Sequence, residues 1–132
     1  IAPPCQLGPN VTLGPHSVID QATIRRKAKV GPHCKISGVV MPQAELEAHV
    51  TVQGWVGAGA NIGANTLVSG KVLRNAIVGP NSTISGFIGI GAAVGSNCVV
   101  EGNVGGGATV GHNSCIGGKV QKEEVVQSNS II

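Results

Sequence analysis

A repeat of sixteen residues dominates this chain of 132 residues. From Ile36 onward, three positions of every repeat carry an aliphatic side chain, separated by steps of four, six and six residues. A short repeat of this kind indicates a solenoid, in which each coil packs only against its neighbours. The three aliphatic columns are Ile36, Val52, Val68, Ile84, Val100, Ile116 and Ile132; Val40, Val56, Val72, Ile88, Val104 and Val120; and Leu46, Ile62, Val78, Val94, Val110 and Val126.

Three branched side chains per repeat predict three short strands per coil, each with one side chain pointing inward. Coils stacked about 4.8 Å apart would hydrogen-bond to the coils above and below. We therefore predict an all-β fold: a single-stranded parallel β-helix with triangular coils of about sixteen residues. A fourth inward column is small and consists of Ala28, Ala44, Ala60, Ala76, Ala92 and Ala108.

Two further columns predict corners of the coil. One is glycine throughout, which indicates either a positive φ or a close approach of the backbone. The other is mostly asparagine, a residue that tolerates the left-handed region. The glycine column is Gly38, Gly54, Gly70, Gly86, Gly102 and Gly118, and the asparagine column is Asn65, Asn81, Asn97, Asn113 and Asn129.

The six-residue steps read aliphatic-Gly-x-x-small-x, as in Val94-Gly95-Ser96-Asn97-Cys98-Val99. From Leu7 onward they resemble the hexapeptide-repeat, left-handed parallel β-helix family. This resemblance, and not the spacing, implies the left-handed sense. The first turns, LGPNVT and LGPHSV, fit the hexad but are offset by one residue from the later repeat. The step of four departs from the family's usual three hexads per coil and predicts one shortened face.

We expect one domain over residues 1–132, with about eight coils. Residues 1–35 form its less regular first coils, 36–119 its regular repeats and 120–132 a degenerate last coil. The last coil is degenerate because Glu124 replaces the stacked alanine and Gln127 replaces a glycine.

The net charge of +3 is unevenly distributed, with five of the nine basic residues at positions 25–35. No aromatic residue is interleaved with them, so we interpret this cluster as a solvated rim and expect no nucleic-acid partner. No apolar run approaches the roughly 18 residues of a membrane helix, so we expect no membrane partner.

The four cysteines, Cys5, Cys34, Cys98 and Cys115, lack the spacing of a disulfide framework or metal site. Cys34 and Cys98 share an inward column but would lie about 19 Å apart at the strand spacing. This is beyond the roughly 7 Å Cα limit for a disulfide. Free thiols favour a cytoplasmic protein.

The family that the hexads resemble includes acyltransferases, zinc enzymes and the C-terminal domains of sugar-nucleotide nucleotidyltransferases. The zinc enzymes use three histidines. Here His33 and His49 occupy the asparagine column and are the candidate metal ligands, but no third ligand is evident, so we expect no metal.

An acyltransferase of this family would bind acyl-CoA and place a general-base histidine between subunits, with His112 as the candidate catalytic residue. However, no inserted loop interrupts the repeat between Ile36 and Ile116. Whether the chain is an enzyme therefore stays open. The loop-free coils resemble the non-catalytic nucleotidyltransferase domains, so we favour a structural or oligomerisation module without a cofactor. A minimal acyltransferase with its site between subunits is the alternative.

One outward column contains Trp55, Lys71 and Phe87 in successive coils, and we predict that it forms a subunit interface. Trp55 and Phe87 would lie about 9.6 Å apart, with Lys71 between them. Exposed aromatic side chains of this kind are typical of interfaces between proteins. The family resemblance implies a homotrimer.

Overall fold

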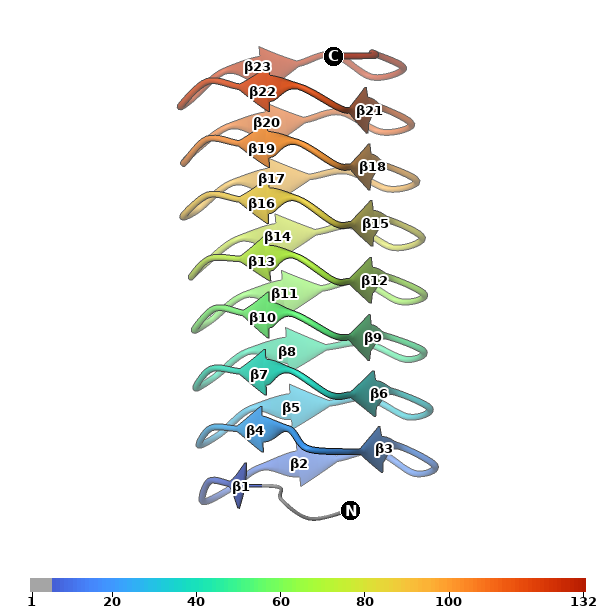
Figure 1. Cartoon of the computed structure of the whole chain (residues 1–132), viewed down its shortest axis with the longest axis vertical. Coiled ribbons are helices and arrows are strands. Elements are labelled where there is room, and N and C mark those ends of the chain that lie inside the picture. The colour runs from blue at the N-terminus through green and yellow to red at the C-terminus, as the bar shows by residue number, and fades with distance from the viewer. Residues whose placement is uncertain (1–5) are drawn as a thin grey trace.

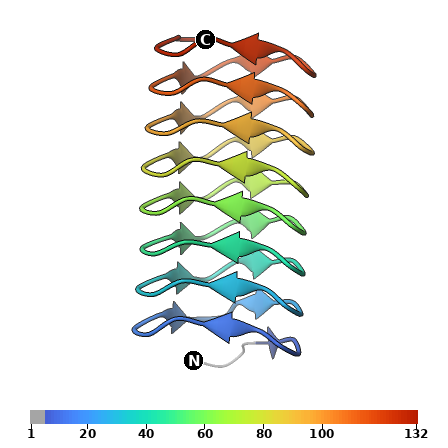
Figure 2. The same cartoon turned by 180° about the vertical axis from the view of Figure 1, so that it is seen from behind.

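The computed structural model describes residues 6–132, which form only β-strands and their connections. In this part of the chain, 23 strands of two residues each wind into a parallel β-solenoid (Figures 1 and 2). β1 to β21 make seven complete coils of three strands, and β22 and β23 begin another. The coil repeat is sixteen residues, so the predicted fold class is confirmed.

The strands stack into three parallel sheets, one on each face of the solenoid. Sheet 1 contains β1 (Gln6–Leu7), β4 (Thr23–Ile24), β7 (Val39–Val40), β10 (Trp55–Val56), β13 (Lys71–Val72), β16 (Phe87–Ile88), β19 (Asn103–Val104) and β22 (Lys119–Val120). Sheet 2 contains β2 (Thr12–Leu13), β5 (Lys29–Val30), β8 (Glu45–Leu46), β11 (Asn61–Ile62), β14 (Ile77–Val78), β17 (Ala93–Val94), β20 (Thr109–Val110) and β23 (Val125–Val126). Sheet 3 contains β3 (Val18–Ile19), β6 (Lys35–Ile36), β9 (Thr51–Val52), β12 (Leu67–Val68), β15 (Thr83–Ile84), β18 (Val99–Val100) and β21 (Cys115–Ile116).

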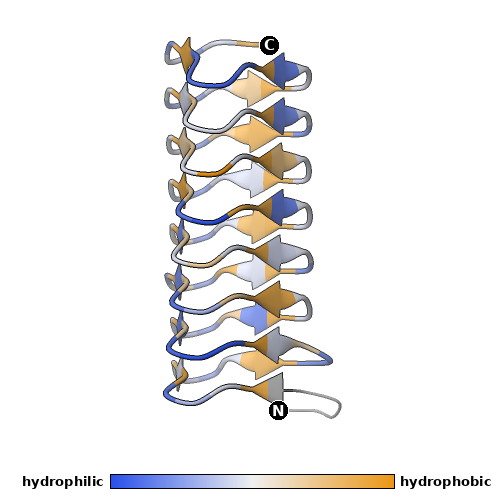
Figure 3. Ribbon diagram, turned by 90° about the vertical axis from the view of Figure 1, so that its left-hand side faces the viewer, coloured by the Kyte–Doolittle hydropathy of each residue, from blue (hydrophilic) through white to orange (hydrophobic). Residues whose placement is uncertain are grey.

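The second residue of each strand from β3 to β23 is buried, so one column from each sheet fills the interior. Figure 3 shows apolar residues recurring in the strands of successive coils, with more polar segments between them. The alanine column from Ala28 to Ala108 is fully buried as predicted. Ile132 differs from the other members of its predicted column because it is 45% exposed.

The connection from sheet 3 to sheet 1 has two residues, whereas the other two connections have four. The four-residue step therefore shortens this corner and leaves the strands of all three sheets equally long. We call it the short corner. A Cβ on Gly38 would overlap the carbonyl oxygen of Gly54 in the next coil, and Gly54, Gly70, Gly86 and Gly102 are equivalent. Close backbone approach, not a positive φ, thus explains the glycine column.

Left-handed residues mark the other two corners. The corner between sheets 2 and 3 holds the asparagine column together with His16, His33 and His49, all with φ between 58° and 64°. This confirms their predicted corner role. The corner between sheets 1 and 2 has a second left-handed column, which the sequence did not reveal because its residues are mixed: Asn10, Lys27, Gln43, Gly59, Asn75, Gly91, Gly107 and Glu123.

The first coil is one residue longer than the others. Val18 pairs with Lys35, seventeen residues later, whereas Thr23 pairs with Val39, sixteen residues later. The extra residue lies in the short corner, where Gln21 adopts a φ of 52°. This explains the offset of the first hexads. Over residues 6–132 there is no helix with the length and apolarity needed to cross a bilayer.

Candidate functional site

The outward residues of sheet 1 form a continuous column along the solenoid. Trp55 pairs with Lys71, and Lys71 pairs with Phe87, so these three side chains lie in successive coils. Val39 extends the column on one side and Asn103 on the other. We call Trp55, Lys71 and Phe87 the aromatic column. Its predicted order is present in the structure.

Both aromatic rings are accessible to solvent, with Trp55 38% and Phe87 37% exposed. The Lys71 Nζ atom lies 5.0 Å from the centroid of the Trp55 ring, within the range of a cation–π interaction. Contacts of this kind contribute about 0.5–1 kcal/mol at an exposed site. The Lys71 amine therefore lies over one face of the Trp55 ring, and part of the side chain stays open to solvent.

The imidazoles of His16, His33 and His49 form a stack at the corner between sheets 2 and 3. Adjacent ring centroids are 5.0 Å apart, with interplanar angles of 9° and 4°. Parallel rings at this spacing follow from the stacking of successive coils. Among residues 6–132, no three His, Cys, Asp or Glu side chains are grouped as a metal site would require.

His112 is exposed at the same corner, several coils away from the histidine stack. Its Nδ1 atom accepts a hydrogen bond of 2.9 Å from the backbone N–H of Ser96. A neutral imidazole that accepts at Nδ1 carries its proton on Nε2. The remaining nitrogen is then a hydrogen-bond donor, whereas a general base needs an unprotonated nitrogen.

An inward column of small polar side chains lies at the corner between sheets 2 and 3, and the sequence did not reveal its hydrogen bonds. The Ser82 hydroxyl donates to the carbonyl of Gly95 at 3.1 Å and accepts from the backbone N–H of Cys98 at 3.3 Å. The Cys98 thiol donates in turn to the carbonyl of Gly111 at 3.1 Å. Buried polar groups in this column thus link successive coils.

The cysteines of the described region are free thiols, as predicted: Cys34 and Cys98 are buried, and Cys115 is exposed. Burial raises the pKa of the Cys34 thiol above its ordinary value of 9.0, against weaker lowering by backbone hydrogen bonds. Cys34 is therefore a protonated thiol at neutral pH, unsuited to nucleophilic chemistry. Cys5 lies outside the described residues.

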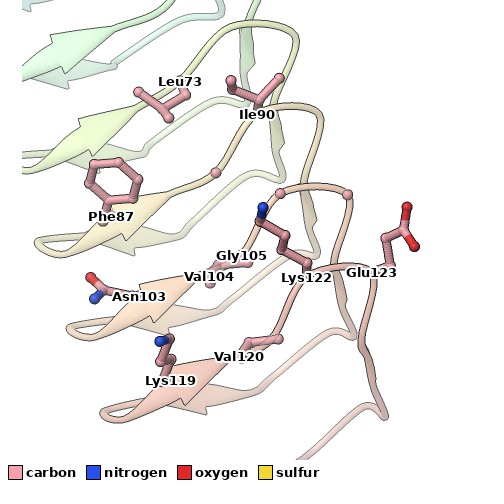
Figure 4. Close-up of a pocket in the computed structure, with 13 residues that line it drawn as sticks. Leu73, Phe87, Ile90, Asn103, Val104, Gly105, Lys119, Val120, Lys122 and Glu123 are labelled. Atoms are coloured by element: carbon pink, nitrogen blue, oxygen red, sulfur yellow. The ribbon is translucent and has the colours of Figure 1, made fainter.

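A groove of about 790 Å³ runs along the corner between sheets 1 and 2 in the later coils (Figure 4). Leu73, Phe87 and Ile90 line it with apolar atoms, and Lys119 and Lys122 provide charged groups. The segment Gly105–Gly107 crosses the groove without any side chain. The repeat alone does not predict this groove, because its shape depends on the side chains of several columns together. The run of three glycines at 105–107 is the one local signal in the sequence that marks this corner as unusual.

A smaller hollow of about 370 Å³ lies at the same corner in the first coils. Leu7, Pro9 and Pro42 line it together with Arg25 and Arg26, two members of the basic cluster. The basic cluster therefore borders this hollow at the N-terminal end of the described solenoid.

Comparison with protein-family models gives no match for this chain, and comparison with curated proteins gives none either. The resemblance to the hexapeptide-repeat family therefore rests on the repeat and on a solenoid fold that is compatible with it.

Proposed function

We propose that this chain is a structural β-solenoid module that associates with copies of itself through the aromatic column. One observation carries the proposal. The chain has one Trp, one Phe and no Tyr, and both rings lie partly exposed on the same sheet. The core formed by the described residues contains no aromatic side chain, so these two rings lie on the surface, where aromatic residues are typical of interface anchors.

A homotrimer is the form of association that we favour, as the family resemblance implies. Closed cyclic symmetry would let each subunit use its aromatic column against another face of its neighbour. Burying the exposed parts of Trp55 and Phe87 would stabilise the contact by about 25 cal/mol per Å² of apolar surface removed from water. Lys71 would add specificity, because the face opposite it must accept a cation.

The left-handed sense of the coil, its hexapeptide-repeat ancestry and a cytoplasmic location are part of the same proposal. The steps of six residues with glycine at the second position support the family. The free thiols Cys34, Cys98 and Cys115 support a reducing compartment. We expect no cofactor and no nucleic-acid or membrane partner.

Light scattering of the purified chain tests the proposal. The expected result is a particle with three times the chain mass of 13.2 kDa. Trp55→Ser/Phe87→Ser should return the chain to the monomer without loss of fold. A monomeric wild-type chain would exclude self-association, and an unchanged mass of the variant would place the interface on another face.

The alternative, a minimal acyltransferase with His112 as its base, has less support from the geometry because Nδ1 of His112 is engaged by Ser96. Calorimetry with acetyl-CoA, whose acyl group is too short to fill an apolar groove, separates the two functions. The structural module predicts no saturable heat of binding, whereas the acyltransferase predicts binding that is lost when subunits separate.

A further inference from the structure

The groove between sheets 1 and 2 owes its depth to Gly106, and the fold does not need a glycine there. Gly106 has no positive φ, and a Cβ would meet the Ile90 carbonyl oxygen at 3.2 Å, a contact that a small shift relieves. The other coils place larger side chains at this corner position, namely Arg26, Pro42, Ala58, Arg74, Ile90 and Lys122. The hollow therefore exists because one side chain is missing where the solenoid accepts almost any residue.

The groove has an apolar end and a cationic end. Leu73, Phe87 and Ile90 line it toward the earlier coils, and Lys119 and Lys122 line it toward the later ones. Leu73 and Lys122 are three coils apart, about 14 Å at the usual strand spacing. A ligand along this groove is thus elongated, with an apolar body and a polar end.

The cationic end carries a net positive charge although Glu123 is also there. Figure 4 shows the Lys122 amine beside Gly105, whereas the Glu123 carboxylate projects outward on the far side. The ammonium groups of Lys119 and Lys122 suit a carboxylate.

We propose that this groove binds one molecule of a free medium-chain fatty acid. Its hydrocarbon chain lies along Leu73, Phe87 and Ile90, and its carboxylate lies between Lys119 and Lys122. A chain of about ten carbons has the length of the groove, given ordinary carbon–carbon bond lengths. Burial of the CH₂ groups would stabilise the hydrocarbon end of the molecule, and the lysine charges would stabilise its carboxylate end.

Calorimetric titration with decanoate, below its micelle concentration, tests the proposal on the intact chain. The expected result is saturable binding of one molecule per chain, weakened at least tenfold by Gly106→Leu. Ala58→Leu is the matched control, because it places the same side chain at the equivalent corner position outside the groove. This variant should bind decanoate as the wild type does.

The lysines are tested by comparing decanoate with decanol. Lys119→Gln/Lys122→Gln should weaken decanoate binding by about tenfold, as expected for losing charged hydrogen-bond donors, and leave decanol binding unchanged. Absence of saturable decanoate binding to the wild type, or equal binding by Gly106→Leu, would overturn the proposal. Binding to anionic vesicles that survives Gly106→Leu would assign the lysines to a membrane surface and overturn it as well.

Phe87 belongs both to this groove and to the aromatic column, so light scattering of the same samples is needed to separate ligand binding from self-association. A monomer that binds decanoate refutes the trimer alone. If the wild type is a trimer that does not bind decanoate, Trp55→Ser weakens the interface and keeps Phe87, and absence of binding to the monomeric variant refutes the ligand alone. Gly106 and Ala58 lie outside the aromatic column, and the masses of their variants show whether self-association is retained.

Discussion

At the scale of single residues, glycine has two separate roles in this solenoid. Gly86 lies at the short corner, where a Cβ would meet the carbonyl oxygen of Gly102 in the next coil. Gly91 has a φ of +70° but has no atom within 4 Å of a Cβ. Gly86 is therefore required because a side chain would clash with the next coil, whereas Gly91 is favoured because its backbone has a positive φ.

Alanine substitutions distinguish these two roles. We expect Gly91→Ala to destabilise the fold by about 1–2 kcal/mol, the usual cost of the left-handed region for an alanine. Gly86→Ala should cost clearly more, because two coils must separate to admit the methyl group. Urea unfolding of both variants checks this order. Equal losses would mean that the short corner relaxes easily.

The buried Cys34 thiol predicts a pH dependence of stability. Burial raises its pKa in the folded state, so its contribution is fully present below the ordinary thiol pKa of 9.0. It is lost as the pH rises through the folded-state pKa, because the unfolded chain releases the proton more readily. Unfolding free energies measured from neutral to alkaline pH should fall less steeply for Cys34→Ser than for the wild type. Identical slopes would contradict the protonated thiol.

At the scale of coils, hydrogen bonds within the Ser82–Cys98 column supplement the backbone ladder. Ser82→Ala removes the partner of both the Gly95 carbonyl and the Cys98 N–H. We expect a loss of about 1–3 kcal/mol, the usual cost of leaving buried polar groups unsatisfied. Ser82→Cys is the control and should cost less, because thiols occupy the same position at Cys34 and Cys98. Chemical denaturation followed by circular dichroism compares the two variants.

The alanine column limits the width of each coil. Ala76 is fully buried, so Ala76→Leu should destabilise the fold by about 1–3 kcal/mol through overpacking. The neighbouring Ile77 is 51% exposed, and Ile77→Leu should change stability by less than about 0.5 kcal/mol. Thermal melts that fail to separate the two variants would show that the inward and outward positions are wrongly assigned.

Sequence predicts these elements well where a column repeats one residue type. The aliphatic and alanine columns predicted the strands and the core, and the asparagine column predicted a left-handed corner. The second left-handed corner was missed because Gly59, Asn75 and Glu123 share a conformation but not a chemistry. For the glycine column that begins at Gly38, the sequence left open whether a positive φ or a close approach of the backbone requires glycine. Only the spacing of adjacent coils in the structure decides between the two.

At the scale of the whole molecule, candidate sites are harder to predict than the coil. Trp55, Lys71 and Phe87 could be placed together because a fixed repeat puts equivalent residues side by side. The groove could not be predicted, because it depends on the sizes of side chains in neighbouring columns. The repeat does not predict the hydrogen bond from Ser96 to His112 either, because no other coil has a histidine at the position of His112.

Self-association of the solenoid through the aromatic column is the central claim, and Trp55 is a built-in probe of it. Trp55 is the one tryptophan of the chain and is 38% exposed in the single chain. Its fluorescence can therefore be recorded while light scattering follows the mass across a concentration series. Ile77→Ser, on sheet 2, is the control for loss of an exposed apolar side chain on a different face.

The prediction is that Trp55 emission shifts to shorter wavelength, and that acrylamide quenches it less, over the same concentrations at which the mass rises from 13.2 kDa to three times that value. Ile77→Ser should follow the wild-type curve. A trimer in which Trp55 emission stays unchanged, or a chain that remains at 13.2 kDa at every concentration, would contradict the claim.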